Sequence, residues 1–124
     1  MKRGFTLIEL LVVIFIIAIL IGLSVFGLQG ARSSSRDAVR KADLEQIRSG
    51  IEIYKSDCGD YPDSLSFGGT LSGSCPTSNI YIQTIPNDPI TPNQTYTYSK
   101  TGIGTYALCA TLEQSTDPYC VANP

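Results

Sequence analysis

The feature that most constrains this chain is an unbroken apolar run near its N-terminus. Residues 10–31 are 22 consecutive positions without a formal charge. As a helix rising about 1.5 Å per residue they reach roughly 33 Å, enough to cross the hydrocarbon core of a bilayer. A secretory signal peptide has an apolar core of only about 7 to 15 residues. The run therefore predicts a membrane-spanning helix rather than a signal peptide or the core helix of a small soluble domain.

The composition of the chain excludes several classes of function. The chain has no histidine and no tryptophan, which removes His-based triads, His metal ligands and the commonest general base. We therefore do not expect an enzyme. Residues 58–124 carry one lysine against five acidic residues, whereas phosphate-binding surfaces rest on clustered Lys and Arg. We expect no nucleic-acid partner.

The cysteines indicate the compartment of the C-terminal region. Cys58, Cys75, Cys109 and Cys120 lie in a loop-rich region without CxxC spacing, which is typical of two disulfides in a non-reducing compartment. Three pairings are possible, and Cys58–Cys75 with Cys109–Cys120 is favoured because these pairs close the shortest local loops. A count of the basic residues that follow the apolar run favours a cytosolic C-terminal part instead. We give the cysteines more weight and expect this part outside the cytosol.

A short junction precedes the apolar run. Lys2 and Arg3 are followed by Gly4 and by Phe5-Thr6-Leu7-Ile8-Glu9. This junction resembles the start of the type IV pilins and type II secretion pseudopilins, which have a short basic leader, a glycine and FTLIE before an apolar helix. The resemblance implies that a membrane-bound prepilin peptidase cuts between Gly4 and Phe5, and that the new Phe5 amine is methylated.

Glu9 is the one acidic residue at the edge of the apolar run. A carboxylate in this position must be solvated, neutralised or paired. The resemblance implies that Glu9 pairs with the Phe5 amine of a neighbouring copy in a helical fibre. Such a pair would set the axial register of assembly.

A second helical pattern follows the apolar run. Apolar positions recur on one face of a helix at Leu44, Ile47, Ile51, Tyr54 and Cys58. Charged residues lie four apart on the other face, at Asp37 with Lys41 and at Arg48 with Glu52, and we interpret this face as solvated. We expect one helix from residue 5 to about residue 55, with Ser33, Ser34 and Ser35 as candidates for a hinge between its halves.

Residues 58–124 contain all seven prolines, so loops dominate this region. The best hairpin pairs residues 95–99 with 105–112 across a turn at 101–104. The predicted fold is α+β, a pilin-like lollipop whose long N-terminal helix packs against a small, loop-rich, antiparallel β region with disulfides. The predicted parts are a leader (1–4), a membrane-embedded or fibre-core half of the helix (5–31), an amphipathic half (32–57) and a globular region (58–124).

Motifs beyond the junction resemble the major (G-type) pseudopilins. They are residues 41–44 and 54–57, Gly-Asp-Tyr-Pro at 59–62, Ile-Pro-Asn-Asp-Pro at 85–89 and Tyr-Thr-Tyr at 96–98. G-type members bind calcium in an Asp-rich C-terminal loop. Here that loop is replaced by the stretch from Cys109 to Cys120, with Glu113 and Asp117 as weak candidate ligands, whereas calcium prefers six to eight oxygens. We expect no cofactor and a disulfide that clamps this loop in place of the metal.

The resemblance implies a structural subunit that is cleaved, methylated and assembled into a helical fibre of identical copies. A prepilin peptidase, an inner-membrane platform protein and an assembly ATPase are the implied partners. The expected location is the cytoplasmic membrane, crossed once, with the C-terminal region outside the cytosol, and then a periplasmic or cell-surface fibre. A type IV pilus subunit for adhesion, DNA uptake or motility is an alternative. A membrane-anchored extracytoplasmic binding module is an alternative of another class, and would keep residues 1–4 and stay monomeric.

Overall fold

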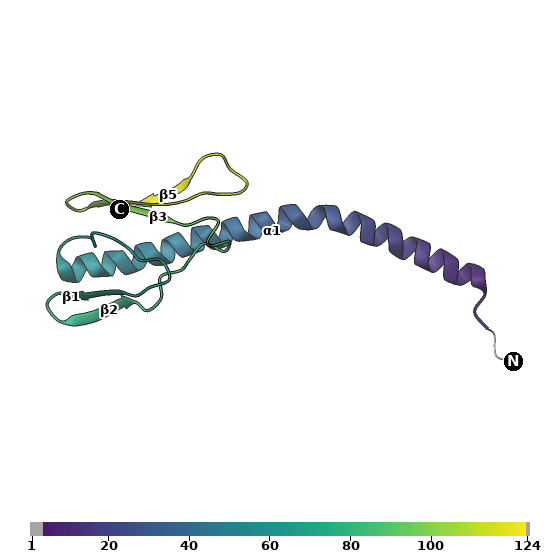
Figure 1. Cartoon of the computed structure of the whole chain (residues 1–124), viewed down its shortest axis with the longest axis horizontal. Helices are drawn as coiled ribbons and strands as arrows, with labels where there is room; N and C mark the ends of the chain where they lie inside the picture. The colour runs from purple at the N-terminus through teal and green to yellow at the C-terminus, as the bar shows by residue number, and fades with distance from the viewer. Residues whose placement is uncertain (1–3, 124) are drawn as a thin grey trace. The chain divides into compact units, whose positions relative to one another are not determined.

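The computed structural model describes residues 4–123, apart from the side chain of Phe26, so residues 1–3 of the expected leader lie outside the described part. The described residues form one helix, α1 (Leu7–Cys58), followed by strands β1 (Leu71–Ser74), β2 (Ser78–Ile82), β3 (Thr97–Gly102), β4 (Thr105–Ala110) and β5 (Tyr119–Ala122) (Figure 1). This order, with antiparallel pairing in both sheets, confirms the predicted α+β class.

Helix α1 is 52 residues long and is helical through Ser33, Ser34 and Ser35. It starts at Leu7 rather than at Phe5 and ends at Cys58. The chain divides into two compact units, Met1–Ser34 and Ser35–Pro124. The boundary falls slightly beyond the predicted one between residues 31 and 32, and each unit is described by itself below.

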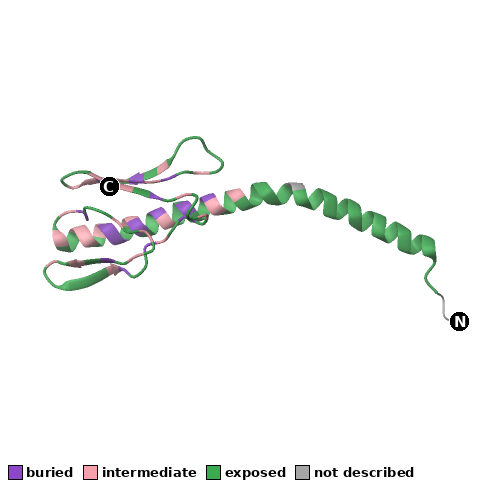
Figure 2. Cartoon of the chain, viewed as in Figure 1, coloured by how far each residue is buried: buried purple, intermediate pink, exposed green. Residues whose placement is uncertain are grey.

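The described part of the first unit is apolar and exposed. Its large apolar side chains expose between 46%, at Val13, and 81%, at Phe5 and Leu7, of their surface. Figure 2 shows the described residues from 4 to 32 as exposed. α1 contains one stretch long and apolar enough to cross a membrane. Because exposed apolar surface of this extent is unfavourable in water, the first unit requires a cover that the single chain does not supply.

The second unit has its own apolar core. Leu44, Ile47 and Ile51 are fully buried, and Tyr54 and Cys58 are half-buried, as the predicted helical stripe requires. In β4 the side chains of Tyr106, Leu108 and Ala110 are buried and alternate with half-buried ones. The remaining core residues are Tyr61, Leu71, Ile82, Ile85, Tyr96 and Val121.

Two small sheets build the rest of the second unit, and Figure 1 shows them on opposite sides of the C-terminal part of α1. β1 and β2 form a hairpin, and β4 lies between β3 and β5. The predicted hairpin is present as β3–β4, with a two-residue turn at Ile103 and Gly104 in place of the expected four residues. Gly104 has a φ of 70°, which favours glycine. The β1–β2 hairpin and β5 were not predicted.

A second glycine sets the distance between α1 and β2. A Cβ atom added to Gly50 would overlap the Cγ1 atom of Ile82. A larger residue at position 50 would therefore push the strand off the helix. Glycine in a helix costs about 1 kcal/mol relative to alanine, and here the close approach of Ile82 explains its presence.

Tyrosine hydroxyls join the loops and strands to carboxylates of α1. Tyr96 donates to Asp43 at 2.6 Å, Tyr61 to Glu52 at 2.8 Å and Tyr81 to Asp57 at 3.0 Å. Part of the charged face of the helix is thus covered by aromatic rings. A rigid amphipathic ring with a polar tip is well suited to this position, because the hydroxyl is satisfied while the ring is buried.

Candidate functional site

The first candidate site is the junction before the apolar helix, residues 4–9. The Thr6 N–H donates to Glu9 Oε2 at 2.8 Å, and the Thr6 hydroxyl donates to the same oxygen at 2.7 Å. In return, the Glu9 N–H donates to Thr6 Oγ1 at 3.4 Å. This reciprocal arrangement is a capping box, in which a Thr at the N-cap and a Glu three residues later satisfy N–H groups at the start of the helix. It explains why α1 begins at Leu7.

Packing among the described residues does not require a glycine at position 4. A Cβ atom added to Gly4 would have none of their heavy atoms within 4 Å. Phe5, the next residue, is 81% exposed. Packing among the described residues therefore does not explain a glycine followed by an aromatic residue here.

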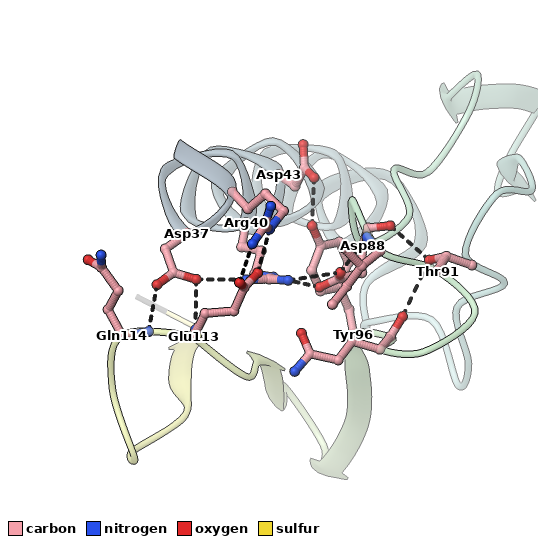
Figure 3. A network of polar contacts seen from close by, with 11 residues as sticks. Asp37, Arg40, Asp43, Asp88, Thr91, Tyr96, Glu113 and Gln114 are labelled. Atoms are coloured by element: carbon pink, nitrogen blue, oxygen red, sulfur yellow. Dashed lines mark hydrogen bonds and ion pairs between the residues drawn. The ribbon is translucent and has the colours of Figure 1, made fainter. Parts of the chain in front are cut away.

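The second candidate site is a buried ionic cluster around Arg40 in the second unit (Figure 3). The Arg40 side chain has no exposed surface. Its Nε donates to Asp88 Oδ2 at 2.7 Å, and one terminal nitrogen donates both to Asp37 Oδ1 at 2.7 Å and to Glu113 Oε1 at 2.9 Å. The sequence analysis interpreted the helix face that carries Asp37 and Lys41 as solvated. That interpretation is wrong for Asp37, which is buried with Arg40.

The cluster ties the loop between β4 and β5 to the helix. Asp37 accepts the backbone N–H groups of Glu113, at 2.9 Å, and of Gln114, at 3.0 Å. Arg36 donates from Nε to Glu113 at 2.6 Å. Hydrogen bonds from Arg36 and then Arg40, with partial desolvation acting against them, lower the pKa of Glu113 to about 2. Glu113 is therefore ionised and held by two guanidinium groups at neutral pH.

Two disulfides complete the second unit. Cys58 is bonded to Cys75, which fastens the β1–β2 hairpin to the end of α1. Cys109 is bonded to Cys120, and these residues are direct partners in the pairing of β4 with β5. This is the pairing that the local loop lengths favoured.

Both the N-terminal junction and most of the rest of the chain match known proteins. Residues 1–25 match the family model described as the prokaryotic N-terminal methylation motif. The chain is 38% identical over 96 residues to the type II secretion system core protein G of Klebsiella michiganensis, covering 71% of this chain and 68% of that protein. It is 33% identical over 97 residues to the protein of the same name from Pseudomonas aeruginosa, with 71% and 68% covered. The chain belongs to the type II secretion system core protein G family.

Other members of the core protein G family are similar to the same extent. The Escherichia coli protein is 33% identical over 96 residues, and these cover 71% of this chain. The chain spans 66% of the length of that relative, 63% of the Dickeya chrysanthemi protein and 62% of the Pectobacterium carotovorum protein, slightly less than two thirds. No solved structure matches the chain.

For this core protein G family member, the structure brings together some of the predicted site residues. Phe5 and Glu9 lie within one turn of the start of α1, with Thr6 between them as the residue that contacts Glu9. The role of Thr6 was missed, although the spacing Thr-x-x-Glu before an apolar run is a recognisable sign of a capping box. Arg40 was also missed.

The two candidate calcium ligands have different surroundings. Both oxygens of Glu113 accept hydrogen bonds from guanidinium groups, and Asp117 is exposed in the β4–β5 loop. Within the part of the chain that the structure describes, no group of three or more Cys, Asp or Glu side chains is placed to hold a metal ion. Calcium prefers six to eight oxygen ligands, and one of these two carboxylates is already paired with guanidinium groups.

Proposed function

We propose that this chain is a structural subunit of a type II secretion pseudopilus. In this proposal a prepilin peptidase cuts between Gly4 and Phe5, leaves 120 of the 124 residues and methylates the Phe5 amine. The methylation motif over residues 1–25 supports this processing. The proposed role is mechanical and structural, with no catalytic step.

The observation that carries the proposal is the uncovered apolar half of α1. Every large apolar side chain described between Leu7 and Leu28 is exposed by 46% or more. The lipid bilayer covers this surface in the free subunit, and the same half-helices of neighbouring copies cover it in a fibre. We therefore place the free subunit in the cytoplasmic membrane with its disulfide-bonded unit outside the cytosol, and propose a platform protein and an assembly ATPase as partners.

The contacts of Glu9 with Thr6 support this assembly role. Its Oε2 accepts both hydrogen bonds from Thr6, and neither of these bonds uses Oε1. The cap can thus persist while Oε1 receives the new Phe5 ammonium group of a neighbouring copy. A mispaired copy would bury an unmatched carboxylate, which is costly, so the pair would select one axial register.

We also propose that the β4–β5 loop is held without calcium. Arg40 supplies the positive charge among Asp37, Asp88 and Glu113, and the Cys109–Cys120 bond closes the loop. No described feature of the second unit favours the pilus alternative, and the anchored binding module leaves the junction at residues 4–9 unexplained.

Processing is tested by intact mass and N-terminal sequencing of the chain from membrane and sheared-surface fractions of a host with an active prepilin peptidase. We expect a 120-residue species that starts at methylated Phe5, largely retained in the cell envelope. Its abundance in the sheared fraction would instead indicate a surface pilus. A chain that still begins at Met1 would overturn the fibre proposal.

Glu9→Leu and Glu9→Ala test the assembly role, with Glu45→Ala on the exposed face of α1 as the matched control. We expect both Glu9 variants to insert and to be cleaved but to lose at least about tenfold in fibre yield, since the intersubunit charge pair is absent. Normal fibres from both variants would remove Glu9 from the mechanism.

A further inference from the structure

The β3–β4 turn presents an apolar knob. Ile103 is 93% exposed, the highest fraction among the large apolar side chains that the structure describes. Gly102 and Gly104 flank it, so no neighbouring side chain shields it. The turn is also held in place, because the Gly104 N–H donates to Asp60 Oδ1 at 2.9 Å and Asp60 is paired with Lys100 at 2.8 Å.

A groove lies elsewhere on the same unit. It has a volume of about 470 Å³ and a mostly apolar surface. Gln46, Ser49, Gly50 and Ile53 of α1 line one side, and residues 81–84 at the end of β2 line the other. Ile53 is 56% exposed there. Gly50 lets Ile82 approach the helix closely and so forms the floor.

The knob and the groove are chemically matched. Residues 101–105 of the turn read Thr-Gly-Ile-Gly-Thr and carry no charge, and none of the groove residues is charged. Contact between the two would bury an aliphatic side chain without desolvating an ionised group, which is the favourable case for an interface.

The two features cannot meet within one chain. The turn is fixed to Asp60, beyond the end of α1 at Cys58, whereas the helical side of the groove ends at Ile53. A second copy displaced along the helix axis, by at least the five helical residues from Ile53 to Cys58 or about 7.5 Å, brings its turn level with the groove. Contact between two different surfaces is heterologous, and repetition of such a contact generates a helical filament.

We propose that Ile103 of one copy docks into the Ile53 groove of a neighbouring copy as a contact between the second units of the two copies in the fibre. The inference rests on the proposed function, since it requires assembly. It adds a contact between the second units to the one at Glu9. The occupant is a second copy because the complementary knob is on this chain itself.

Cysteine pairing tests the contact in assembled fibres of the full chain. Ile103→Cys combined with Ile53→Cys should give a ladder of covalent multimers on a non-reducing gel, with the 103–53 link identified by peptide mass. Ile103→Cys combined with Ile80→Cys is the matched control, because Ile80 is 61% exposed but lies outside the groove. Wild-type-like fibres without the 103–53 link would overturn the proposal.

Charge substitution gives a second readout. Ile103→Asp should lower fibre yield at least about tenfold, because the apolar contact is lost and a carboxylate must be desolvated. Ile80→Asp should assemble normally, and Ile53→Lys should restore assembly to Ile103→Asp. Unchanged yield from Ile103→Asp would contradict this contact alone, whereas unprocessed wild-type chain without fibres would contradict the proposed function itself.

Discussion

Arg40 is a charged residue buried inside the small second unit. Its guanidinium is fully buried and makes ion pairs with Asp37, Asp88 and Glu113. Burial of a charge is costly unless it is paired and hydrogen-bonded. Hydrogen bonding to Asp88 raises the pKa of Arg40 above its ordinary value, with burial acting in the other direction. Arg40 therefore remains ionised, and the cluster joins three segments far apart in sequence.

Arg40→Leu should destabilise the second unit strongly. It leaves Asp37 and Asp88 buried without their cation, and loss of one partner of a buried pair costs about 3 to 5 kcal/mol. Thermal unfolding of the full chain in detergent can be followed by near-UV circular dichroism of the tyrosines, all seven of which lie between residues 54 and 119.

The matched control is Arg48→Leu on the same helix. Arg48 is partly exposed and contacts Glu45 at 3.5 Å, and surface pairs contribute about 1 kcal/mol or less. We expect a small change for this variant. Equal effects of the two substitutions would show that the Arg40 cluster is not a major source of stability.

At the scale of single residues, the sequence predicts core positions with helical spacing but not ion pairs between distant segments. Helical spacing identified Leu44, Ile47 and Ile51 as core because the signal is local. The same spacing paired Asp37 with Lys41, whereas Asp37 contacts Arg40. Arg40 also pairs with Asp88 and Glu113, which are 48 and 73 positions away. Periodicity carries no information about partners at such separations.

At the scale of elements, α1 and the β3–β4 hairpin were predictable because their patterns are long or alternate regularly. β1 has the sequence Leu-Ser-Gly-Ser and little β propensity, so only its pairing with β2 and the Cys58–Cys75 bond explain it. At the candidate site, a local sequence motif identified Gly4, Phe5 and Glu9. The contact of Thr6 with Glu9 was found only in the structure.

The β4–β5 loop gives an element-scale prediction about calcium. A site with an affinity of about 10 μM would add about 2.7 kcal/mol of stability at about 1 mM calcium. Because Glu113 is already held by Arg36 and Arg40, we expect the Tm of the full chain in detergent to be the same, within about 1 °C, in calcium and in EDTA.

The double variant Cys109→Ser with Cys120→Ser serves as the positive control for this loop. It should lower the free energy of unfolding by about 2 to 4 kcal/mol, the usual contribution of a native disulfide. A calcium-dependent rise of several degrees in the wild type would refute the metal-free clamp.

For the molecule as a whole, the two units depend on different surroundings. The first is stable only when its apolar surface is covered, and the second has a core, two disulfides and a set of carboxylates held by cations. Asp60 is one of these: hydrogen bonds from Lys100, then from the Gly104 and Tyr61 backbone N–H groups, lower its pKa to about 2. Together with Glu113, it makes the second unit sensitive to acid.

The lowered pKa values of Asp60 and Glu113 determine how the stability of the second unit changes with pH. Unfolded Glu and Asp side chains titrate near about 4.3 and 3.9, and both folded pKa values are lower. The unfolded state therefore binds more protons between about pH 5 and pH 2, so the stabilisation is complete above about pH 5 and is lost as the pH falls toward 2. The Tm of the full chain, measured in an uncharged detergent, should fall steadily across this range.

The variants Glu113→Gln and Asp60→Asn should each have a lower Tm at pH 7 and a flatter decline toward pH 2, because the titrating group has been removed. Asp117→Asn changes an exposed carboxylate of the same β4–β5 loop and should follow the wild-type curve. If the Glu113 and Asp60 variants also run parallel to the wild type, these two carboxylates are not the acid-labile ties of the second unit, and other carboxylates of the unit must account for the decline.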